Sequence, residues 1–545
     1  MTPDDHSARA ESLRAQSGWL AGLSPTLALV GKGFVLLLVL LAVIDAKTLG
    51  EIVFALRDAI FVNLKWHYIL LVSATLGFVV WLSFSRFGTM KLGDDDEKPE
   101  FSYASWIAML FGAGMGIGLV FWSVAEPLTH YQSNPFIDMG GDPATTAMRL
   151  TFFHWGLHPW AIYATVGLAL AYFAHRRKMP LTIRSTLYPL LGERVYGPWG
   201  HVIDLLSMMA TLFGVATSLG LGVKQINTGL NILTGWDVSV THELILIGGI
   251  TAIAVGSVSS GLHRGIKWLS NWNMVLAIAL LLFVFVAGPT RILVNTFVQS
   301  VGDYLGNIVS LSFWMDANGD SGWQKAWTTF YWGWWIAWAP FVGMFIARIS
   351  RGRTIREFIF GVLVMPTLIT FVWLALFGGT AFHAEREGAD LVAAVTSDVT
   401  TGLYSTIATL ASGATETIVA ALATVLIVTF FVTSSDSGTL VINTLMSVGD
   451  PEPPLSHRVI WGVTEGAVAA VLLLAGGLEA LQATAISAAL PFSIILILMM
   501  IALARALEHD YVHAPQPALK PGVEAADADI AAHLRESSLG VSAGE

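Results

Sequence analysis

The chain has 545 residues, of which 54% are hydrophobic and only 12% are charged, with a formal net charge of -10 and no cysteine. A soluble domain carries about 25% charged residues, so this composition excludes a disordered chain, a coiled coil and a nucleic-acid-binding protein, and argues strongly against a large soluble enzyme. The apolar residues form continuous runs instead of the alternation of a β-barrel. The composition therefore predicts an all-α polytopic membrane protein.

Twelve apolar runs are long enough to cross the roughly 30 Å of membrane hydrocarbon as helices. They lie near residues 27–46, 68–85, 104–124, 150–174, 202–226, 243–260, 268–288, 326–347, 357–380, 417–436, 459–476 and 484–505. Acidic residues precede the first run, so we expect no cleavable signal peptide. The loops on one side carry more Lys and Arg, which places both termini in the cytoplasm and the protein in the plasma (inner) membrane.

Six segments follow from these runs. They are a cytoplasmic N-terminal tail (1–26), two transmembrane helices with a loop (27–103), a first group of five helices (104–290), an outer amphipathic helix with a loop (291–322), a second group of five helices (323–505) and an acidic cytoplasmic tail (506–545). Residues 291–312 are mildly amphipathic, so we expect a helix along the outer surface. Residues 389–412 are rich in Thr and Ser and indicate an outer loop or a re-entrant piece.

The third span contains glycines at Gly112, Gly114, Gly116 and Gly118. Each glycine inside a helix costs about 1 kcal/mol relative to alanine, so four of them favour local unwinding. In a membrane, unwound backbone is tolerated only where it is buried in protein or lines a wet cavity. The alternative is close helix packing, because the glycines also satisfy the small-xxx-small pattern.

The eighth span carries Pro340 in its middle, with Gly333 and Gly343 nearby, which predicts a second interrupted helix. Two interrupted helices, each starting a group of five spans, are typical of a transporter with two repeats and a binding site at the bilayer midplane.

The same span holds a cluster of tryptophans that does not suit an ordinary interfacial position. Its members are Trp332, Trp334, Trp335 and Trp338, and the fourth span adds Trp155, Trp160 and Tyr163. A single tryptophan usually lies at the membrane–water interface. Several rings in mid-span indicate instead a site for a quaternary ammonium group, because aromatic faces attract a cation that donates no strong hydrogen bonds. A sugar would need more buried polar side chains than these spans offer.

Four motifs resemble the betaine/choline/carnitine transporter family. They are GMGIG at residues 114–118, SVAEPLTHY at residues 123–131, the tryptophan-rich stretch at residues 330–353 and TSSDSG at residues 433–438. The resemblance covers about residues 25–505. It implies the five-plus-five inverted-repeat fold of the sodium-coupled amino-acid symporters, a homotrimer, and secondary active transport instead of enzymatic activity.

The resemblance also implies a substrate site, closest in motif to that of the sodium-coupled glycine betaine transporters. The trimethylammonium group would lie in a box formed by Trp155, Tyr163, Trp334, Trp335 and Trp338. Trp160 and Phe345 match neighbouring aromatics of the pathway. Backbone N–H groups of the unwound stretch, near Met115, Gly116 and Gly118, could bind the carboxylate end of the substrate.

Gly118 bears on the choice of substrate. By resemblance, betaine carriers keep glycine here, whereas proton-coupled choline carriers place an aspartate there. An anion at this position would attract choline and repel the carboxylate of a zwitterion, so the glycine favours a betaine-type compatible solute, most of all glycine betaine. Dimethylsulfoniopropionate, ectoine, proline betaine and carnitine remain possible, and Ala337 replaces a serine of some betaine carriers.

Sodium is the coupling ion that the resemblance implies, and no other cofactor is expected. The matching ligands are Gly112, Met115, Phe430, Thr433 and Ser434. For the two hydroxyls the alternative is back-bonding to carbonyls of their own helix. A second sodium site would use Thr211 and lie near Phe341, but Val215 stands where a second hydroxyl is expected, so this site is in doubt.

Other readings remain. They are a proton-coupled choline carrier, an ion-independent carnitine exchanger of the same fold, a channel, and an intramembrane enzyme, for which we find no nucleophile–base or metal constellation. His154 and His158 are spaced like metal ligands, but no acidic residue lies between them, so hydrogen-bonded roles are favoured. Glu126 and Asp436 are candidate structural carboxylates.

Overall fold

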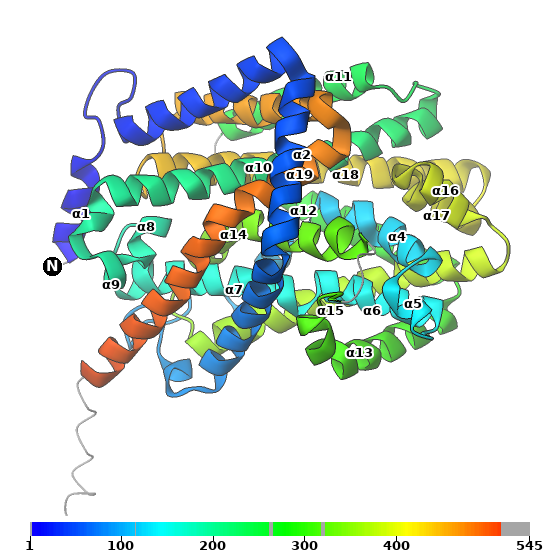
Figure 1. Cartoon of the computed structure of the whole chain (residues 1–545), viewed down its shortest axis with the longest axis horizontal. Coiled ribbons are helices and arrows are strands. Elements are labelled where there is room, and N and C mark those ends of the chain that lie inside the picture. Colours follow the sequence, from blue (N-terminus) through cyan, green and yellow to red (C-terminus); the bar gives the residue numbers. More distant parts are fainter. Residues whose placement is uncertain (1–2, 115, 261–264, 318–321, 514–545) are drawn as a thin grey trace, which may run out of the picture. The chain divides into compact units, whose positions relative to one another are not determined.

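A computed structural model of the chain describes residues 3–114, 116–260, 265–317 and 322–513, and these are nearly all helical (Figure 1). Residues Met1–Leu503 form one compact unit, and Ala504–Glu545 form a second, described only as far as His513, where it is helical. The predicted acidic tail beyond His513 therefore lies outside the described residues. Among the described residues, nine helices are long and apolar enough to span a membrane.

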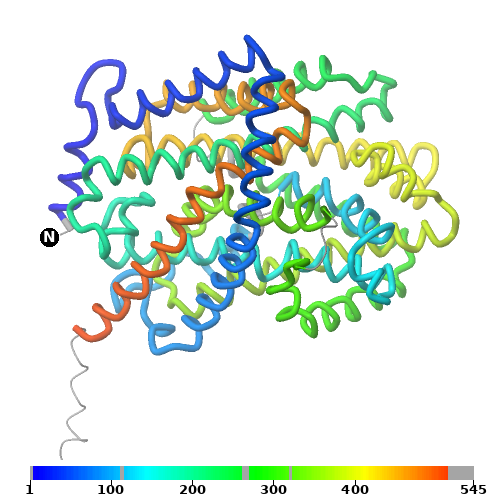
Figure 2. The backbone as a smooth tube through the Cα atoms, viewed as in Figure 1, coloured from blue at the N-terminus to red at the C-terminus, as the bar shows by residue number. Residues whose placement is uncertain are grey.

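The N-terminal part is more helical than predicted. After α1 (Pro3–Ser12), α2 runs from Pro25 to Phe84 and merges the first two predicted spans, with one kink at Asp45, where φ is -152° and ψ is 84°. The predicted loop between the spans is wrong, because residues 47–67 contain no proline and are rich in good helix formers. The Asp45 carboxylate accepts hydrogen bonds from the backbone N–H and the hydroxyl of Thr48, and so caps the helix after the kink. Figure 2 shows the resulting change of direction.

The third predicted span is interrupted, as its glycines predict. Helix α3 spans Tyr103–Gly114 and α4 spans Ile117–Gln132, with Gly116 between them and Met115 outside the described residues. The fourth span is also broken, which we did not predict. Here α6 (Pro143–Trp155) and α7 (Leu157–Ala171) meet at Gly156, where a Cβ would lie 2.6 Å from the Phe152 carbonyl oxygen and 2.7 Å from the Phe371 ring.

The prediction that Pro340 interrupts the eighth span is wrong. Helix α14 is continuous from Phe330 to Ile349, and its irregular turn is the π-helix η4 (Lys325–Thr329) that precedes it. The nearby glycines serve close helix packing instead. A Cβ on Gly343 would lie 2.5 Å from Val166 of α7, and one on Gly333 would lie 2.8 Å from the Cα of Ile486.

The remaining helices follow the predicted order. Their bounds are α5 (Pro135–Asp138), η2 (Tyr172–Arg176), α8 (Ile183–Thr186), α9 (Tyr188–Leu191), η3 (Gly192–Tyr196), α10 (Pro198–Thr234), α11 (Val240–Ser260), α12 (Gly265–Ala287), α13 (Thr290–Phe313), α15 (Ile355–Arg386), α16 (Leu391–Ser397), η5 (Val399–Thr401), α17 (Gly402–Leu410), α18 (Gly413–Met446) and α19 (Leu455–His513), after η1 (Arg86–Thr89). Helix α13 confirms the helix predicted for residues 291–312.

The predicted loop or re-entrant piece at 389–412 consists of α16, η5 and α17. Helix α19 joins the last two predicted spans across a break at Gly476 and Gly477.

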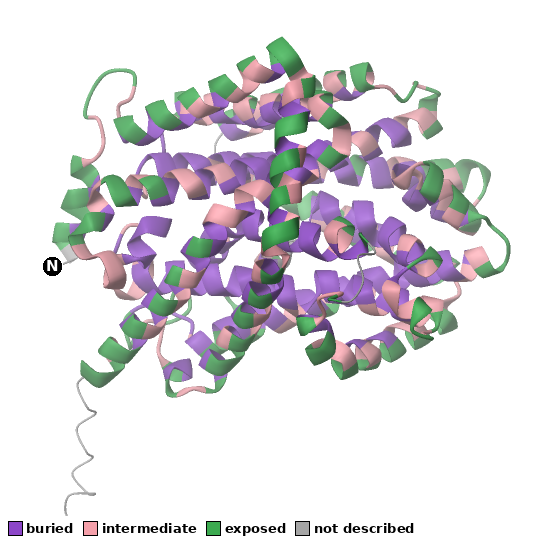
Figure 3. Ribbon diagram, viewed as in Figure 1, coloured by how far each residue is buried: buried purple, intermediate pink, exposed green. Residues whose placement is uncertain are grey.

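Burial divides the helices into two groups (Figure 3). Side chains of α4, α7 and α14 are almost all buried, and α7 packs along α14. Helices α2 and α12, by contrast, expose large apolar side chains, among them Leu37, Ile44 and Val286 at 67%, 81% and 76%. Such apolar exposure suits a surface that faces lipid. The central helices therefore form the protein core in which the predicted site lies.

Candidate functional site

The five rings of the predicted box come together where α6, α7 and α14 meet. Trp155 ends α6 and meets Trp335 edge-on, with ring centroids 5.0 Å apart. Tyr163 of α7 also meets Trp335 edge-on, at 6.1 Å. Trp334 stacks on Trp335 at 4.7 Å and meets Trp338 edge-on at 6.3 Å. These five residues are called the ring cluster below.

The ring cluster is buried inside the protein and not placed at an interface. The five side chains are between 1% and 4% exposed. Three indole N–H groups are satisfied within the protein. Trp335 donates to the His154 carbonyl oxygen at 2.9 Å, Trp334 donates to the Ser218 hydroxyl at 3.3 Å, and Trp155 donates to the Glu126 carboxylate at 2.7 Å. The Tyr163 hydroxyl and the Trp338 Nε1 have no hydrogen-bond partner in the described part of the chain. Both atoms are therefore available to the polar part of a ligand.

The two predicted pathway aromatics differ. Trp160 lies against the ring cluster, because its ring meets Tyr163 edge-on at 5.6 Å. Phe345 lies about two turns beyond Trp338 on α14, is only half-buried, and has no ring contact with the cluster in the chain that the structure describes. The structure thus brings Trp160, but not Phe345, to the ring cluster.

The unwound stretch borders both the ring cluster and α18. A Cβ on Gly118 would lie 2.3 Å from Cη2 of Trp334, so the absence of a side chain lets this ring approach the backbone. A Cβ on Gly116 would lie 3.5 Å from the hydroxyl of Ser434. Met115, predicted for both the substrate and the sodium site, lies outside the described residues.

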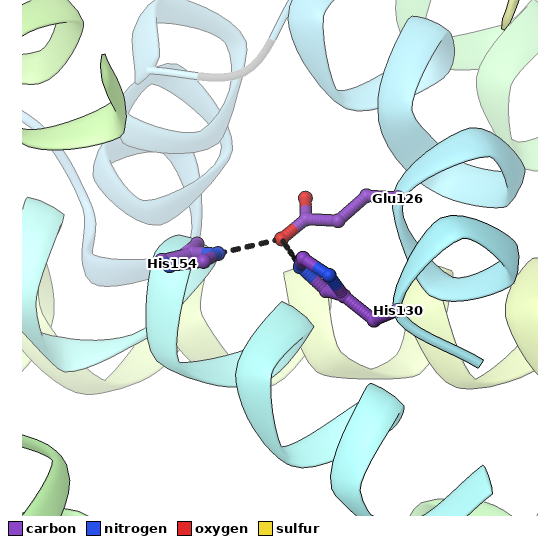
Figure 4. Close-up of side chains that lie close together, drawn as sticks. All are labelled: Glu126, His130 and His154. Atoms are coloured by element: carbon purple, nitrogen blue, oxygen red, sulfur yellow. Dashed lines mark hydrogen bonds and ion pairs between the residues drawn. The ribbon is translucent and has the colours of Figure 1, made fainter. Parts of the chain in front are cut away.

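Glu126 of α4 lies beside His130 and His154 (Figure 4) and also holds a ring of the ring cluster in place, a role that was not predicted from the sequence. Its carboxylate is fully buried and accepts hydrogen bonds from Trp155 Nε1 at 2.7 Å, from His154 Nδ1 at 2.7 Å and from the Tyr331 hydroxyl. An ionisable residue inside an apolar span is a functional candidate by default, and the sequence indicated Glu126 only as a candidate structural carboxylate. Glu126 places a buried carboxylate directly behind one ring of the cluster.

The histidines around Glu126 complete this arrangement. Trp323 donates to Nδ1 of His130 at 3.3 Å, so a neutral His130 carries its proton on Nε2, which lies 3.3 Å from the Glu126 carboxylate. The ligand atoms of Glu126, His130 and His154 all lie within 4.8 Å of one another, a spacing that could hold a metal ion. Because the carboxylate already has three hydrogen-bond donors, we assign the group to the support of the rings. His158 instead bonds Ser312 of α13 at 2.8 Å.

Three of the five predicted sodium ligands lie on one side of α18. Thr433 donates to carbonyls of its own helix and accepts a hydrogen bond from Asn273 of α12 at 3.0 Å, which agrees with the back-bonding alternative. Ser434 faces Gly116, and Phe430 is buried. Gly112 is part of α3, near its end.

The doubtful second sodium site gains no oxygen from the structure. The Thr211 hydroxyl donates to the Ser207 carbonyl at 2.9 Å, and Phe341 packs its ring against Trp338 at 5.4 Å. Val215, which stands where a second hydroxyl is expected, packs toward Gly438 of α18.

Comparisons with known proteins bear on the identity of this site. The family model for the betaine/carnitine/choline family transporters matches residues 26–512. A glycine betaine transporter, OpuD, of Bacillus subtilis is 48% identical over 87% of this chain and 92% of its own length. A probable glycine betaine transporter of Desulfitobacterium hafniense is 44% identical over 89% and 98%, and an ectoine/hydroxyectoine transporter of Virgibacillus pantothenticus is 42% identical over 86% and 94%.

These relatives are transporters and not enzymes, and the apolar helices make the chain a multi-pass membrane protein. The resemblance that its motifs indicate is confirmed over nearly the whole chain. The chain belongs to the betaine/carnitine/choline family of transporters.

Proposed function

We propose that this transporter imports glycine betaine, a zwitterionic compatible solute, together with sodium ions. The observation that carries the proposal is the ring cluster, in which five aromatic side chains meet in the protein interior. A desolvated cation gains about 0.5–2 kcal/mol from each aromatic face, so several rings offset a large part of the cost of dehydrating a trimethylammonium group.

Glu126 strengthens this preference for a cation. Its carboxylate accepts a hydrogen bond from the Trp155 N–H, which makes the indole ring more electron-rich. The ring cluster thus offers an onium group aromatic faces, one of which is hydrogen-bonded to a buried carboxylate. The free polar atoms of Tyr163 and Trp338, with the backbone at the Gly116 break and the first turn of α4 at Gly118, are the groups that we expect to face the carboxylate end.

The contact between Gly118 and Trp334 supports a zwitterion over choline. An aspartate at position 118 would collide with the Trp334 ring, so this chain cannot hold the anion expected of a choline carrier without moving the ring. Its relatives include glycine betaine transporters and an ectoine/hydroxyectoine transporter. Ectoine, carnitine and dimethylsulfoniopropionate are therefore the substrates to compare with glycine betaine.

Sodium coupling rests on the oxygen-rich side of α18, where Ser434 faces the break between α3 and α4. An ion held there would link the unwound stretch to α18, and its release would loosen both. One charge moved inward gains about 2.3 kcal/mol per 100 mV of membrane potential, so one sodium ion drives strong accumulation of a zwitterion. Cytoplasmic termini and a homotrimer follow from the loop charges and the family resemblance.

Uptake into proteoliposomes tests the proposal. Radiolabelled glycine betaine should accumulate with external sodium, should not accumulate with potassium in its place, and should depend little on a pH gradient. Unlabelled glycine betaine should compete better than choline, carnitine, ectoine or dimethylsulfoniopropionate. Uptake driven by a proton gradient without sodium, or choline as the best competitor, would refute it.

A pair of variants tests whether uptake depends on the ring cluster. Trp335→Leu removes the central ring of the cluster and should abolish uptake, whereas Trp335→Phe, which keeps an aromatic face, should retain part of it. Trp199→Leu is the matched control, because Trp199 is 61% exposed and lies outside the ring cluster. Equal uptake by Trp335→Leu and Trp199→Leu would separate transport from the ring cluster.

A further inference from the structure

A second group of buried oxygens lies between α11, α18 and α19. It consists of Asp436 and Thr439 of α18 together with Glu465 of α19, and all three side chains are at most 1% exposed. Asp436 and Thr439 are one helical turn apart and share a face of α18. The carboxylate of Glu465 lies close enough to interact with both. The transport site described above uses none of the three residues.

Two serines hold one oxygen of each carboxylate. The Ser435 hydroxyl donates to Oε2 of Glu465 at 3.0 Å, and the Ser257 hydroxyl of α11 donates to Oδ2 of Asp436. A Cβ on Gly438 would lie 3.2 Å from Oε1 of Glu465 and 3.0 Å from Val215, which shows how tightly α10, α18 and α19 enclose this carboxylate. The geometry of both acids is therefore fixed.

The other three oxygens have no well-formed hydrogen bond. Oδ1 of Asp436 has no hydrogen-bond partner within the described ranges, and Oε1 of Glu465 and Oγ1 of Thr439, although the two side chains lie close to each other, lack a hydrogen bond of good geometry. The Thr439 hydroxyl is aimed at α19, since a Cβ on Gly462, one turn before Glu465, would lie 3.5 Å from it. A buried polar atom without a partner is rare in native proteins and calls for an explanation, such as an ion.

The charges of the two carboxylates also favour a bound cation. Neither carboxylate forms an ion pair with any basic side chain that the structure describes. Two neighbouring carboxylates inside a membrane protein repel each other and are costly without a partner of opposite charge. The serine hydroxyls donate hydrogen bonds but bring no net charge. A bound cation supplies both the charge and the contacts that the three oxygens lack.

We infer that Asp436, Thr439 and Glu465 form a sodium-binding site separate from the one predicted at Thr433 and Ser434. A donor set made only of carboxylate and hydroxyl oxygens suits a hard cation. Thr433 lies one turn before Asp436, but the two sites have different neighbours. Thr433 and Ser434 face Asn273 of α12 and Gly116, whereas Asp436 and Thr439 face Ser257 of α11 and Gly462 of α19. Sodium here would clamp α19 to α18 and α11, and its loss would free helices that must move during transport.

Counting bound ions tests the site without any transport. The full-length protein, purified in detergent, is equilibrated with 22Na+ at fixed pH and without glycine betaine. We expect Glu465→Gln to bind one sodium ion fewer per chain than the wild type. Glu479→Gln, on the same helix with a side chain 76% exposed, should bind as many as the wild type. The same number of ions in Glu465→Gln and the wild type would overturn the inference.

Thr439→Val keeps both acids and so serves where Glu465→Gln fails to fold. It should raise the sodium concentration for half-saturation at least threefold, and an unchanged value would overturn the site. The inference builds on the proposed sodium coupling, yet its test is separable. Quenching of tryptophan fluorescence by glycine betaine reports the substrate site independently, so loss of substrate binding and loss of the sodium ion are distinct results.

Discussion

Glu126 shows how a single residue can determine the geometry of a binding site. Three hydrogen-bond donors, two from α6 and one from α14, converge on its carboxylate, and one of them is the indole of Trp155 in the ring cluster. A carboxylate only accepts hydrogen bonds, whereas a glutamine amide also donates two. The site therefore requires a side chain whose oxygens accept all three hydrogen bonds and not merely one of this shape.

Glu126→Gln should lower both stability and substrate affinity. At least one of the donors around it would lose its acceptor, and a buried donor without a partner costs about 1–3 kcal/mol. We expect a lower midpoint of thermal unfolding and about tenfold weaker binding of glycine betaine, measured by tryptophan fluorescence, if about 1.4 kcal/mol of that cost falls on binding. Glu479→Gln is the control. Unchanged binding by Glu126→Gln would show that the ring cluster does not depend on this carboxylate.

Gly118 is a second residue whose effect can be isolated. Gly118→Ala places a methyl group 2.3 Å from the Trp334 ring, so the ring must move away from the first turn of α4. We expect at least a tenfold lower initial rate of uptake, normalised to the amount of reconstituted protein. Gly248→Ala is the control, because a Cβ there meets nothing within 4 Å. Similar rates for the two variants would contradict the close contact of ring and backbone.

At the scale of elements, the breaks in helices position the site more than the helices do. The break at Gly116 faces Ser434 and starts α4, whose Gly118 lies against Trp334, and the break at Gly156 ends α6 directly after Trp155. A helix start leaves N–H groups without partners. At Gly156 the Tyr304 hydroxyl of α13 accepts a hydrogen bond from Leu157 N–H at 3.2 Å. The surface helix α13 thus stabilises a break next to the ring cluster.

Tyr304→Phe removes this acceptor and leaves the ring in place. The free energy of unfolding should fall by about 1–3 kcal/mol, because a partly buried N–H loses its partner. Thermal unfolding of the purified protein measures the change. Tyr103→Phe, at a tyrosine that is 50% exposed, should leave the midpoint unaltered. Equal midpoints for the two variants would mean that α13 does not support the break.

The elements also show what local sequence could predict. The glycine run predicted the break after α3, because each glycine weakens a helix, and the amphipathic pattern predicted α13. The break predicted from Pro340 was wrong, because the contacts of α14 with its neighbours keep the helix continuous across the proline. Gly156 gave no local signal, because its role depends on Phe371, which is more than 200 residues away. Residues 47–67 were predicted as a loop because they lie between the first two apolar runs, although they favour helix.

For the whole molecule, the ring cluster was predictable in its members but not in its support. Trp155, Tyr163, Trp334, Trp335 and Trp338 could be named from motifs, and the structure brings them together. Glu126, by contrast, meets Tyr331 about 200 residues later in the chain, and no local pattern reveals such a pair. The same holds for Asp436 and Glu465, which lie on different helices. Polar contacts between residues far apart in the chain could not be predicted from the sequence.

The central claim is that the ring cluster binds the positive charge of an onium group. Its most direct test compares glycine betaine with 3,3-dimethylbutanoate, which has the same shape and carboxylate but a neutral head, in titrations of the purified protein followed by tryptophan fluorescence with sodium present. The account predicts saturable quenching by glycine betaine, at least tenfold weaker binding of the neutral analogue, and loss of the difference in Trp335→Leu. Equal affinity for the two compounds in the wild type would contradict it.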